Sequence, residues 1–144
     1  MRRYDDLEIG ERQASRLLRV DRSDMIAFAK TYDPQWFHAD ETAAKESIFG
    51  EVTASGIYGL ALWRRLDHEI CGDIDFICGV AWQNVQWFKA LKADMQIRAT
   101  SELISKRASS SDPTRGIVTF ISGIEDDQGD PLIRFENITL VKRA

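Results

Sequence analysis

The sequence is poor in the residues that build disulfide networks and metal centres. Only two cysteines, Cys71 and Cys78, occur among its 144 residues. No histidine or acidic cluster stands beside them at metal-ligand spacing, so we expect a reduced, structural pair and no metal site. The sequence also lacks a His-Glu-x-x-His motif and a glycine-rich phosphate loop, which gives no support to a zinc peptidase or a nucleotide-binding enzyme of those classes.

Long apolar runs are missing as well. None approaches the roughly 20 residues that cross a bilayer, and the start, Met1–Asp6, lacks the apolar segment of a signal peptide. A net charge of −4 and a pI near 5.2 argue against a general affinity for nucleic acid or anionic membranes. We therefore expect a cytoplasmic protein with no nucleic-acid or membrane partner.

The composition, 44% hydrophobic and 29% charged, suits one globular domain over residues 1–144. The first half has the apolar spacing of helices, and the second half has the alternation of β-strands. A polar run at residues 126–131 predicts the turn between the last two strands. Four successive strands are expected, at Val80–Phe88, Asp94–Arg107, Gly116–Glu125 and Leu132–Lys142.

Two helices are expected on either side of a proline in the first half. Residues 12–20 predict a short strand that leads into a helix, for which Asp21 is a suitable N-cap. This helix should end near Tyr32, because Pro34 disfavours the α conformation in the residue before it. Asp40 can cap a second, short helix over Glu41–Ser47. Residues 33–39 are then a loop anchored at both ends.

A third helix is the longest and is expected over Ser55–Cys71, with Gly72 as its C-terminal cap. It is apolar around most of its circumference, so it should be buried. A long buried helix followed by an antiparallel meander predicts an α+β fold, with the sheet wrapped around the helix. Such a sheet leaves an exposed edge that a second chain can cover, so we expect a homodimer or a higher homo-oligomer.

The candidate chemistry lies around residues 32–56. Tyr32-Asp33-Pro34-Gln35-Trp36-Phe37-His38 places a carboxylate near one of only two histidines. Ala54-Ser55-Gly56 then opens the long helix, whose first N–H groups have no acceptor within the helix and suit an oxyanion. A base, its polar partner and such a helix start predict an enzyme. Structural alternatives stay open, because Asp33 can be a turn residue, His38 a cap partner, Ser55 the helix cap and Gly56 a packing position.

These segments, together with the Ala-rich helix and Phe49-Gly50 between them, resemble the MaoC-like dehydratases. That family includes the R-specific enoyl-CoA hydratases of hotdog fold. The opening Tyr4-Asp5-Asp6-Leu7-Glu8-Ile9-Gly10 is also similar to the start of such chains. Asp33 and His38 keep the family's interval of five positions. Gln35 and Trp36 stand where Asn and Pro are common, a departure that concerns the substrate more than the fold.

The resemblance implies a single hotdog domain and a hydro-lyase of fatty acid metabolism. Its reaction is addition of water to a trans-2-enoyl thioester or removal from a 3-hydroxyacyl thioester. Asp33 would be the base, His38 would hold the same water, and the N–H of Gly56 would polarise the thioester carbonyl. No cofactor is implied beyond coenzyme A as part of the substrate, and acyl carrier protein stays open as the carrier. Substrate contacts are expected from Ser55, Gln35, Phe37 and Trp36.

Two other functions remain open at this point. Hotdog thioesterases commonly carry a carboxylate on the central helix, but residues 57–63 contain no acid, which favours hydration. A non-catalytic acyl-CoA-binding hotdog protein is the other alternative, and the Gln35 and Trp36 departures keep it open. His68 is expected at the surface. Trp82, Trp87 and Phe88 are expected in the sheet core or at a dimer contact.

Overall fold

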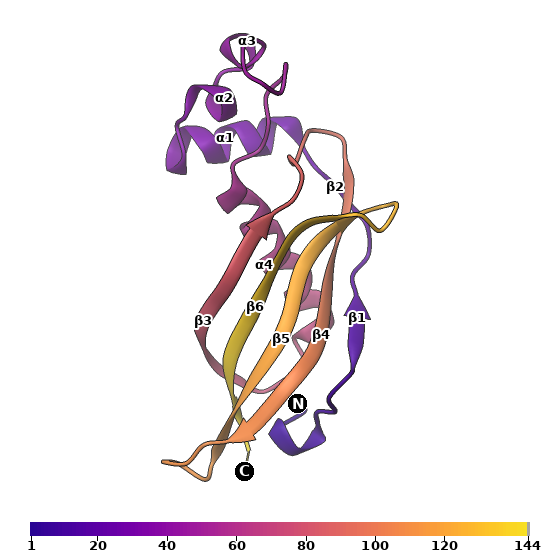
Figure 1. Ribbon diagram of the computed structural model, residues 1–144, viewed down its shortest axis with the longest axis vertical. Helices are drawn as coiled ribbons and strands as arrows, with labels where there is room; N and C mark the ends of the chain where they lie inside the picture. The colour runs from indigo at the N-terminus through magenta and orange to yellow at the C-terminus, as the bar shows by residue number, and fades with distance from the viewer. Residues whose placement is uncertain (144) are drawn as a thin grey trace.

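The computed structural model describes residues 1–143, in which a curved sheet wraps around one long helix (Figure 1). The sheet has six strands in the order β1-β4-β5-β6-β3, with β2 also paired to β4, and every strand pairing is antiparallel. The expected α+β architecture is therefore confirmed. The strands are β1 (Arg12–Ala14), β2 (Leu18–Arg19), β3 (Phe76–Trp87), β4 (Gln96–Ala108), β5 (Arg115–Asp126) and β6 (Pro131–Lys142).

The helices occupy the first half of the chain, as expected. A 3-10 turn, η1 (Tyr4–Asp6), precedes the helices α1 (Arg22–Tyr32), α2 (Trp36–Ala39), α3 (Glu41–Ala44) and α4 (Gly56–Cys71). In Figure 1, α1, α2 and α3 cluster beyond one end of the sheet, where α4 begins, and α4 then runs along one face of the sheet. No helix among residues 1–143 has the length and apolar character needed to span a membrane.

The expected helix boundaries are partly confirmed. Asp21 accepts the N–H of Asp24 at 2.8 Å, and α1 ends at Tyr32. Residues 33–39 are not a plain loop, however, because α2 forms directly after the proline segment. The expected helix Glu41–Ser47 was too long. After Ala44 the backbone bonds reach back only three residues, for example from Ser47 N–H to Ala44 O at 3.0 Å, so the chain continues as tight turns.

The second half of the chain forms the four expected strands, β3 to β6, in the expected order, but their ends differ from the expected ones. β3 begins at Phe76, four residues before the expected Val80, because the preceding residues already pair with the end of β6. β4 begins at Gln96 because Asp94 has a φ of 69°, a turn conformation that a strand cannot continue. The single strand expected over residues 12–20 is two short strands, both paired to β4.

The core lies between α4 and the sheet. Trp63 of α4 is fully buried and meets Phe135 of β6 edge-on, with ring centroids 4.7 Å apart. Truncation of a buried aromatic side chain of this kind costs about 3–5 kcal/mol. At the start of α4, the Tyr58 hydroxyl donates to Asp24 of α1 at 2.6 Å. The long helix therefore fixes the position of α1 as well as the curvature of the sheet.

One charged group faces the core from α4. The Asp67 side chain is only 4% exposed and accepts a hydrogen bond from Arg64 at 2.9 Å. Burial raises the pKa of the Asp67 carboxyl above its ordinary value, and the Arg64 guanidinium opposes part of this shift. Because the folded-state pKa is raised, ionisation of Asp67 destabilises the fold as the pH rises through that pKa.

We therefore expect Asp67→Asn to raise the free energy of unfolding at pH 8 by roughly 1 kcal/mol. The gain should shrink toward acidic pH, where the wild-type carboxyl is protonated. Urea unfolding across a pH series measures this difference. Glu69→Gln on the same helix is the control, because its partner Arg16 lowers the pKa of Glu69 and the change should not stabilise the protein at any pH. A constant difference between Asp67→Asn and wild type across the series would contradict the assignment.

Candidate active site

A cavity of about 560 Å³ lies at the start of α4. Its polar wall contains Asp33, His38, Ser55 and Gly56, which come from the ends of α1 and α4 and from α2. Pro34 explains part of this arrangement. By ending α1 it releases the chain at Asp33, and the short α2 then turns His38 back toward the same cavity.

The Asp33 carboxylate is held by two side chains. The Ser55 hydroxyl donates to Oδ2 at 2.6 Å, and the Gln35 amide donates to Oδ1 at 3.1 Å. The Ser55 hydrogen bond lowers the pKa of Asp33 below its ordinary value, burial opposes this effect, and Gln35 and the neighbouring His38 add to it. Asp33 is therefore an ionised hydrogen-bond acceptor at neutral pH.

The orientation of the His38 ring is set by a backbone carbonyl. Nδ1 lies 2.7 Å from the carbonyl oxygen of Thr53, which can only accept, so Nδ1 carries the hydrogen. Nε2 then faces Asp33, at 3.8 Å from Oδ2. That separation is too long for a direct hydrogen bond, but it leaves both atoms able to contact one small molecule between them.

Ser55 and Gly56 form the start of the long helix. The Ser55 hydroxyl accepts the N–H of Ile57 at 3.2 Å, so the expected helix cap is confirmed, and the same hydroxyl contacts Asp33. The N–H of Gly56 finds no acceptor within residues 1–143. A Cβ added at Gly56 would lie 2.7 Å from Nε1 of Trp87. Glycine thus permits close packing of Trp87 against the start of α4, where its Nε1 donates to the Gly56 carbonyl at 3.2 Å.

The other expected contact residues divide into two groups. Gln35 and Phe37 line the cavity together with Ser55, whereas Trp36 does not. Its side chain is 49% exposed and packs edge-on against Phe37, with ring centroids 5.4 Å apart. A role for Trp36 in substrate contact therefore has no geometric support.

Several lining residues had no clear signal in the sequence. Thr53 acts through its carbonyl, which every residue type possesses. Trp87 and Phe88, expected in the core or at a dimer contact, are half exposed and line the cavity. A Cβ added at Gly59 would lie 2.5 Å from Cδ1 of Ile133, so these two lining residues pack closely against each other.

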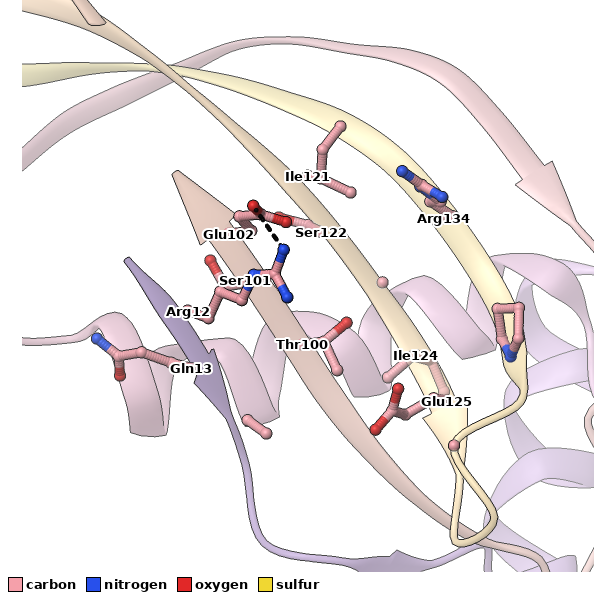
Figure 2. Close-up of a pocket in the computed structure, with 14 residues that line it drawn as sticks. Arg12, Gln13, Thr100, Ser101, Glu102, Ile121, Ser122, Ile124, Glu125 and Arg134 are labelled. Carbon is pink, nitrogen blue, oxygen red and sulfur yellow. Dashed lines mark hydrogen bonds and ion pairs between the residues drawn. The ribbon is translucent and has the colours of Figure 1, made fainter. Parts of the chain in front are cut away.

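A second hollow, of about 590 Å³, lies on the sheet face that points away from α4 (Figure 2). It contains the ion pair between Arg12 and Glu102, at 3.2 Å. It offers no histidine, cysteine or helix N-terminus. No group of three metal-ligating side chains occurs among the described residues either. The cavity at Asp33 is therefore the candidate active site.

Comparison with known proteins shows what the chain is similar to. Residues 7–121 match the family model described as MaoC like domain. The uncharacterized protein YdeM of Bacillus subtilis (strain 168) is 27% identical over 143 residues, which is 98% of this chain and 99% of that protein.

Two solved structures are similar over nearly their whole length. A MaoC-like dehydratase from Rhodospirillum rubrum superposes with a TM-score of 0.89 at 28% identity, covering 100% of this chain and 99% of the other. The 3R-hydroxyacyl-ACP dehydratase complex HadBC from Mycobacterium tuberculosis gives a TM-score of 0.73 at 15% identity, covering 93% and 98%. At that identity, the second likeness shows the fold alone.

Ser55→Ala should raise the pKa of Asp33 toward its ordinary value, because the largest cause of the lowering is removed. It should also reduce the free energy of unfolding by about 1 kcal/mol through loss of the helix cap. A carboxyl NMR titration and urea unfolding measure the two effects. Asp21→Ala is the matched control, since it removes the α1 cap without touching Asp33. An unchanged Asp33 pKa in Ser55→Ala would contradict the assigned contact.

Proposed function

The chain belongs to the MaoC-like domain family, and we propose that it is an acyl-thioester hydro-lyase. It adds water to a 2-enoyl thioester or removes water from a 3-hydroxyacyl thioester. The observation that carries this proposal is the approach of Asp33 and His38 to 3.8 Å beside the free N–H of Gly56. The similarity to the dehydratase from Rhodospirillum rubrum supports the same reaction class.

In the hydration direction, the geometry suits one water held between Asp33 and His38. The Asp33 carboxylate accepts one hydrogen of this water, and Nε2 of His38 accepts the other, because Nδ1–H is bound to Thr53. An oxygen lone pair is then free to attack C3. As the bond to C3 forms, one proton passes from the water to the Asp33–His38 pair, and the C2–C3 π electrons move toward the thioester carbonyl. Removal of water follows the same path in reverse.

The negative charge that develops on the thioester oxygen needs a hydrogen-bond donor to stabilise it. The N–H of Gly56 provides one, and the positive end of the α4 dipole adds to it. C2 then takes up the proton that the Asp33–His38 pair received from the water, which restores the pair and completes the addition of H and OH across the double bond. General acid–base groups typically raise the reaction rate by about 10²–10⁴-fold, and one hydrogen-bond donor to the oxyanion raises it by about 10²–10³-fold.

The substrate proposal is an acyl chain carried by coenzyme A, with acyl carrier protein as the alternative carrier. Phe37, Phe49 and Trp87 give the cavity apolar walls that suit an acyl or pantetheine chain. Ile133 and Gly59, packed against each other, are part of the same lining.

Hydrolysis of the thioester, the other hotdog reaction, has less support. Hotdog thioesterases commonly use a carboxylate on the central helix. Asp67 and Glu69, the two acids of α4, are not among the residues that line the cavity. Asp67 instead faces the core beside Arg64.

We also propose a homodimer formed along β3. This strand of 12 residues lies at the open edge of the sheet (Figure 1). Ile77, Val80 and Trp82 expose apolar side chains along it, at 42%, 57% and 47%. An unpaired, apolar edge of this length favours association with another strand, and a second copy supplies an identical one.

Asp33→Asn and His38→Gln should each lower kcat/KM for crotonyl-CoA by about 10²–10⁴-fold, because each replaces a group that can take a proton from the attacking water with an amide that cannot. The assay follows the absorbance of the conjugated enoyl group and free thiol in parallel. Circular dichroism checks the fold of both variants.

His68→Gln is the matched control, since the only other histidine is exposed and lies late on α4. It should retain the wild-type rate. Wild-type rates in Asp33→Asn, or release of thiol with the double bond intact, would refute the hydro-lyase proposal.

Val80→Lys should convert the dimer into a monomer, because it places a charge in the middle of the β3 edge. Sedimentation velocity measures the mass, and the far-ultraviolet circular dichroism should stay unchanged. Ile9→Lys, another exposed apolar position that lies outside the strands, should remain dimeric. A dimeric Val80→Lys protein would place the interface elsewhere.

A further inference from the structure

We propose that Trp87 is a positioning residue for the oxyanion donor, the N–H of Gly56, an inference that rests on the proposed function. A bulge in β3 at Asn84 turns Trp87 toward the cavity that it lines. Trp87 and Gly56 are 31 residues apart in the sequence and meet only through the fold. In the reaction proposed above, Asp33 and His38 handle the water, and Trp87 acts on neither of them.

The indole of Trp87 packs against the first residue of α4. A Cβ added at Gly56 would lie 2.7, 2.8 and 3.2 Å from three atoms of the ring. The ring therefore occupies the space that a side chain at position 56 would take. The Nε1 atom of the same ring donates to the Gly56 carbonyl at 3.2 Å. Trp87 thus borders the Cα of Gly56 and binds its carbonyl.

These contacts restrain the backbone that presents the oxyanion donor. The Gly56 carbonyl and the Ile57 N–H belong to one planar peptide unit. Trp87 binds its carbonyl end, and the Ser55 hydroxyl accepts from its N–H end at 3.2 Å. The N–H of Gly56 lies in the preceding unit, across a glycine, which has the widest choice of φ and ψ.

Helix hydrogen bonds do not fix the Gly56 N–H, because the first N–H groups of a helix have no acceptor within it. Rotation about the glycine would turn the N–H away from the thioester oxygen. The indole opposes this rotation, because it fills the space beside the Cα and holds the next peptide unit.

The direction of the Trp87 side chain requires an irregular strand. Trp82 and Trp87 of β3 both face α4, since Trp82 meets Trp63 edge-on with ring centroids 5.6 Å apart and Trp87 contacts Gly56. The two tryptophans are five positions apart. In a regular strand, side chains an odd number of positions apart point to opposite faces of the sheet. β3 must therefore change its alternation between them.

A β-bulge makes this change. Residues 83–86 of β3 lie opposite residues 134–136 of β6, so three steps along β3 match two steps along β6. Asn84, inside the bulge, has a φ of 52°, which Asn and Gly adopt more readily than other residues. Trp87 then pairs with Ile133, which also lines the cavity. The extra residue therefore turns Trp87 to the α4 side of the sheet.

Burial alone does not explain this use of a tryptophan. Trp87 is 51% exposed, whereas Trp63 is fully buried. The backbone conformation of Asn84 is also an uncommon one for a residue other than glycine. Bulges and left-handed residues occur preferentially beside functional sites, where they re-aim a side chain. Here the re-aimed side chain borders the proposed oxyanion donor.

Trp87→Phe tests the restraint, because it keeps an aromatic ring and removes the Nε1 donor. The ¹⁵N order parameter of the Gly56 amide should fall from about 0.85, the value of rigid backbone, toward about 0.6. Trp36→Phe is the matched control and should leave this order parameter unchanged, since Trp36 is not among the lining residues. The measurement needs no substrate.

Turnover of crotonyl-CoA tests the consequence. In Trp87→Phe, kcat should fall about 10-fold to 10²-fold while KM changes by less than about threefold, because a misplaced donor weakens the transition state more than the ground state. A role in packing alone would lower the thermal stability and leave the kcat of the folded protein unchanged. Sedimentation velocity checks that the variant keeps its native assembly.

A pair of variants at Asn84 tests the bulge. Asn84→Val should reduce kcat and the Gly56 order parameter as Trp87→Phe does, because a β-branched residue disfavours a positive φ. Asn84→Gly should lie closer to wild type in both measurements, since glycine adopts this conformation freely. Equal values for the two variants would overturn the role of the bulge.

An unchanged Gly56 order parameter in Trp87→Phe would overturn the positioning role, and so would a wild-type kcat. Absence of hydration by the wild-type protein would instead refute the proposed function. The order parameter would then still decide whether Trp87 restrains Gly56, so the two proposals can fail separately.

Discussion

The hydrogen bond from the Ser55 hydroxyl to the Asp33 carboxylate is the contact on which the arrangement of the site depends. It joins the end of α1 to the start of α4 across 22 residues of sequence. The same hydroxyl caps α4 by accepting the N–H of Ile57. One side chain thus ties the position of the carboxylate to the helix end that presents the Gly56 N–H. The bond also lowers the pKa of the Asp33 carboxyl below its ordinary value.

This contact is precise only because α4 is rigid. The helix is packed against the sheet through Trp63 and other buried residues, and Tyr58 fixes α1 beside it. The backbone of Ala54, just before α4, donates to the carbonyl of Leu91 at 2.8 Å, which holds the loop after β3 against the helix start. The groups proposed to be catalytic lie on short segments, and Asp33 and His38 each contact the segment that leads into α4. Such support is what a preorganised site needs.

Much of this arrangement could be predicted from local signals in the sequence. Pro34 marked the end of α1, and Asp21, Asp40 and Ser55 are helix caps, as their residue types indicate. The interval between Asp33 and His38 pointed to a shared site. Contacts through the backbone were not predictable, which is why the role of the Thr53 carbonyl was missed. α2 was missed because four residues carry too little periodicity. The burial of Asp67 depends on tertiary packing, which local patterns do not show.

The most direct test of the account is a crystal structure of the protein with a bound 3-hydroxyacyl-CoA. The account predicts that the 3-hydroxyl oxygen lies within hydrogen-bond distance of both the Asp33 carboxylate and Nε2 of His38. The thioester oxygen should accept the N–H of Gly56. A ligand whose hydroxyl contacts neither side chain, or whose carbonyl points away from the start of α4, would contradict the account.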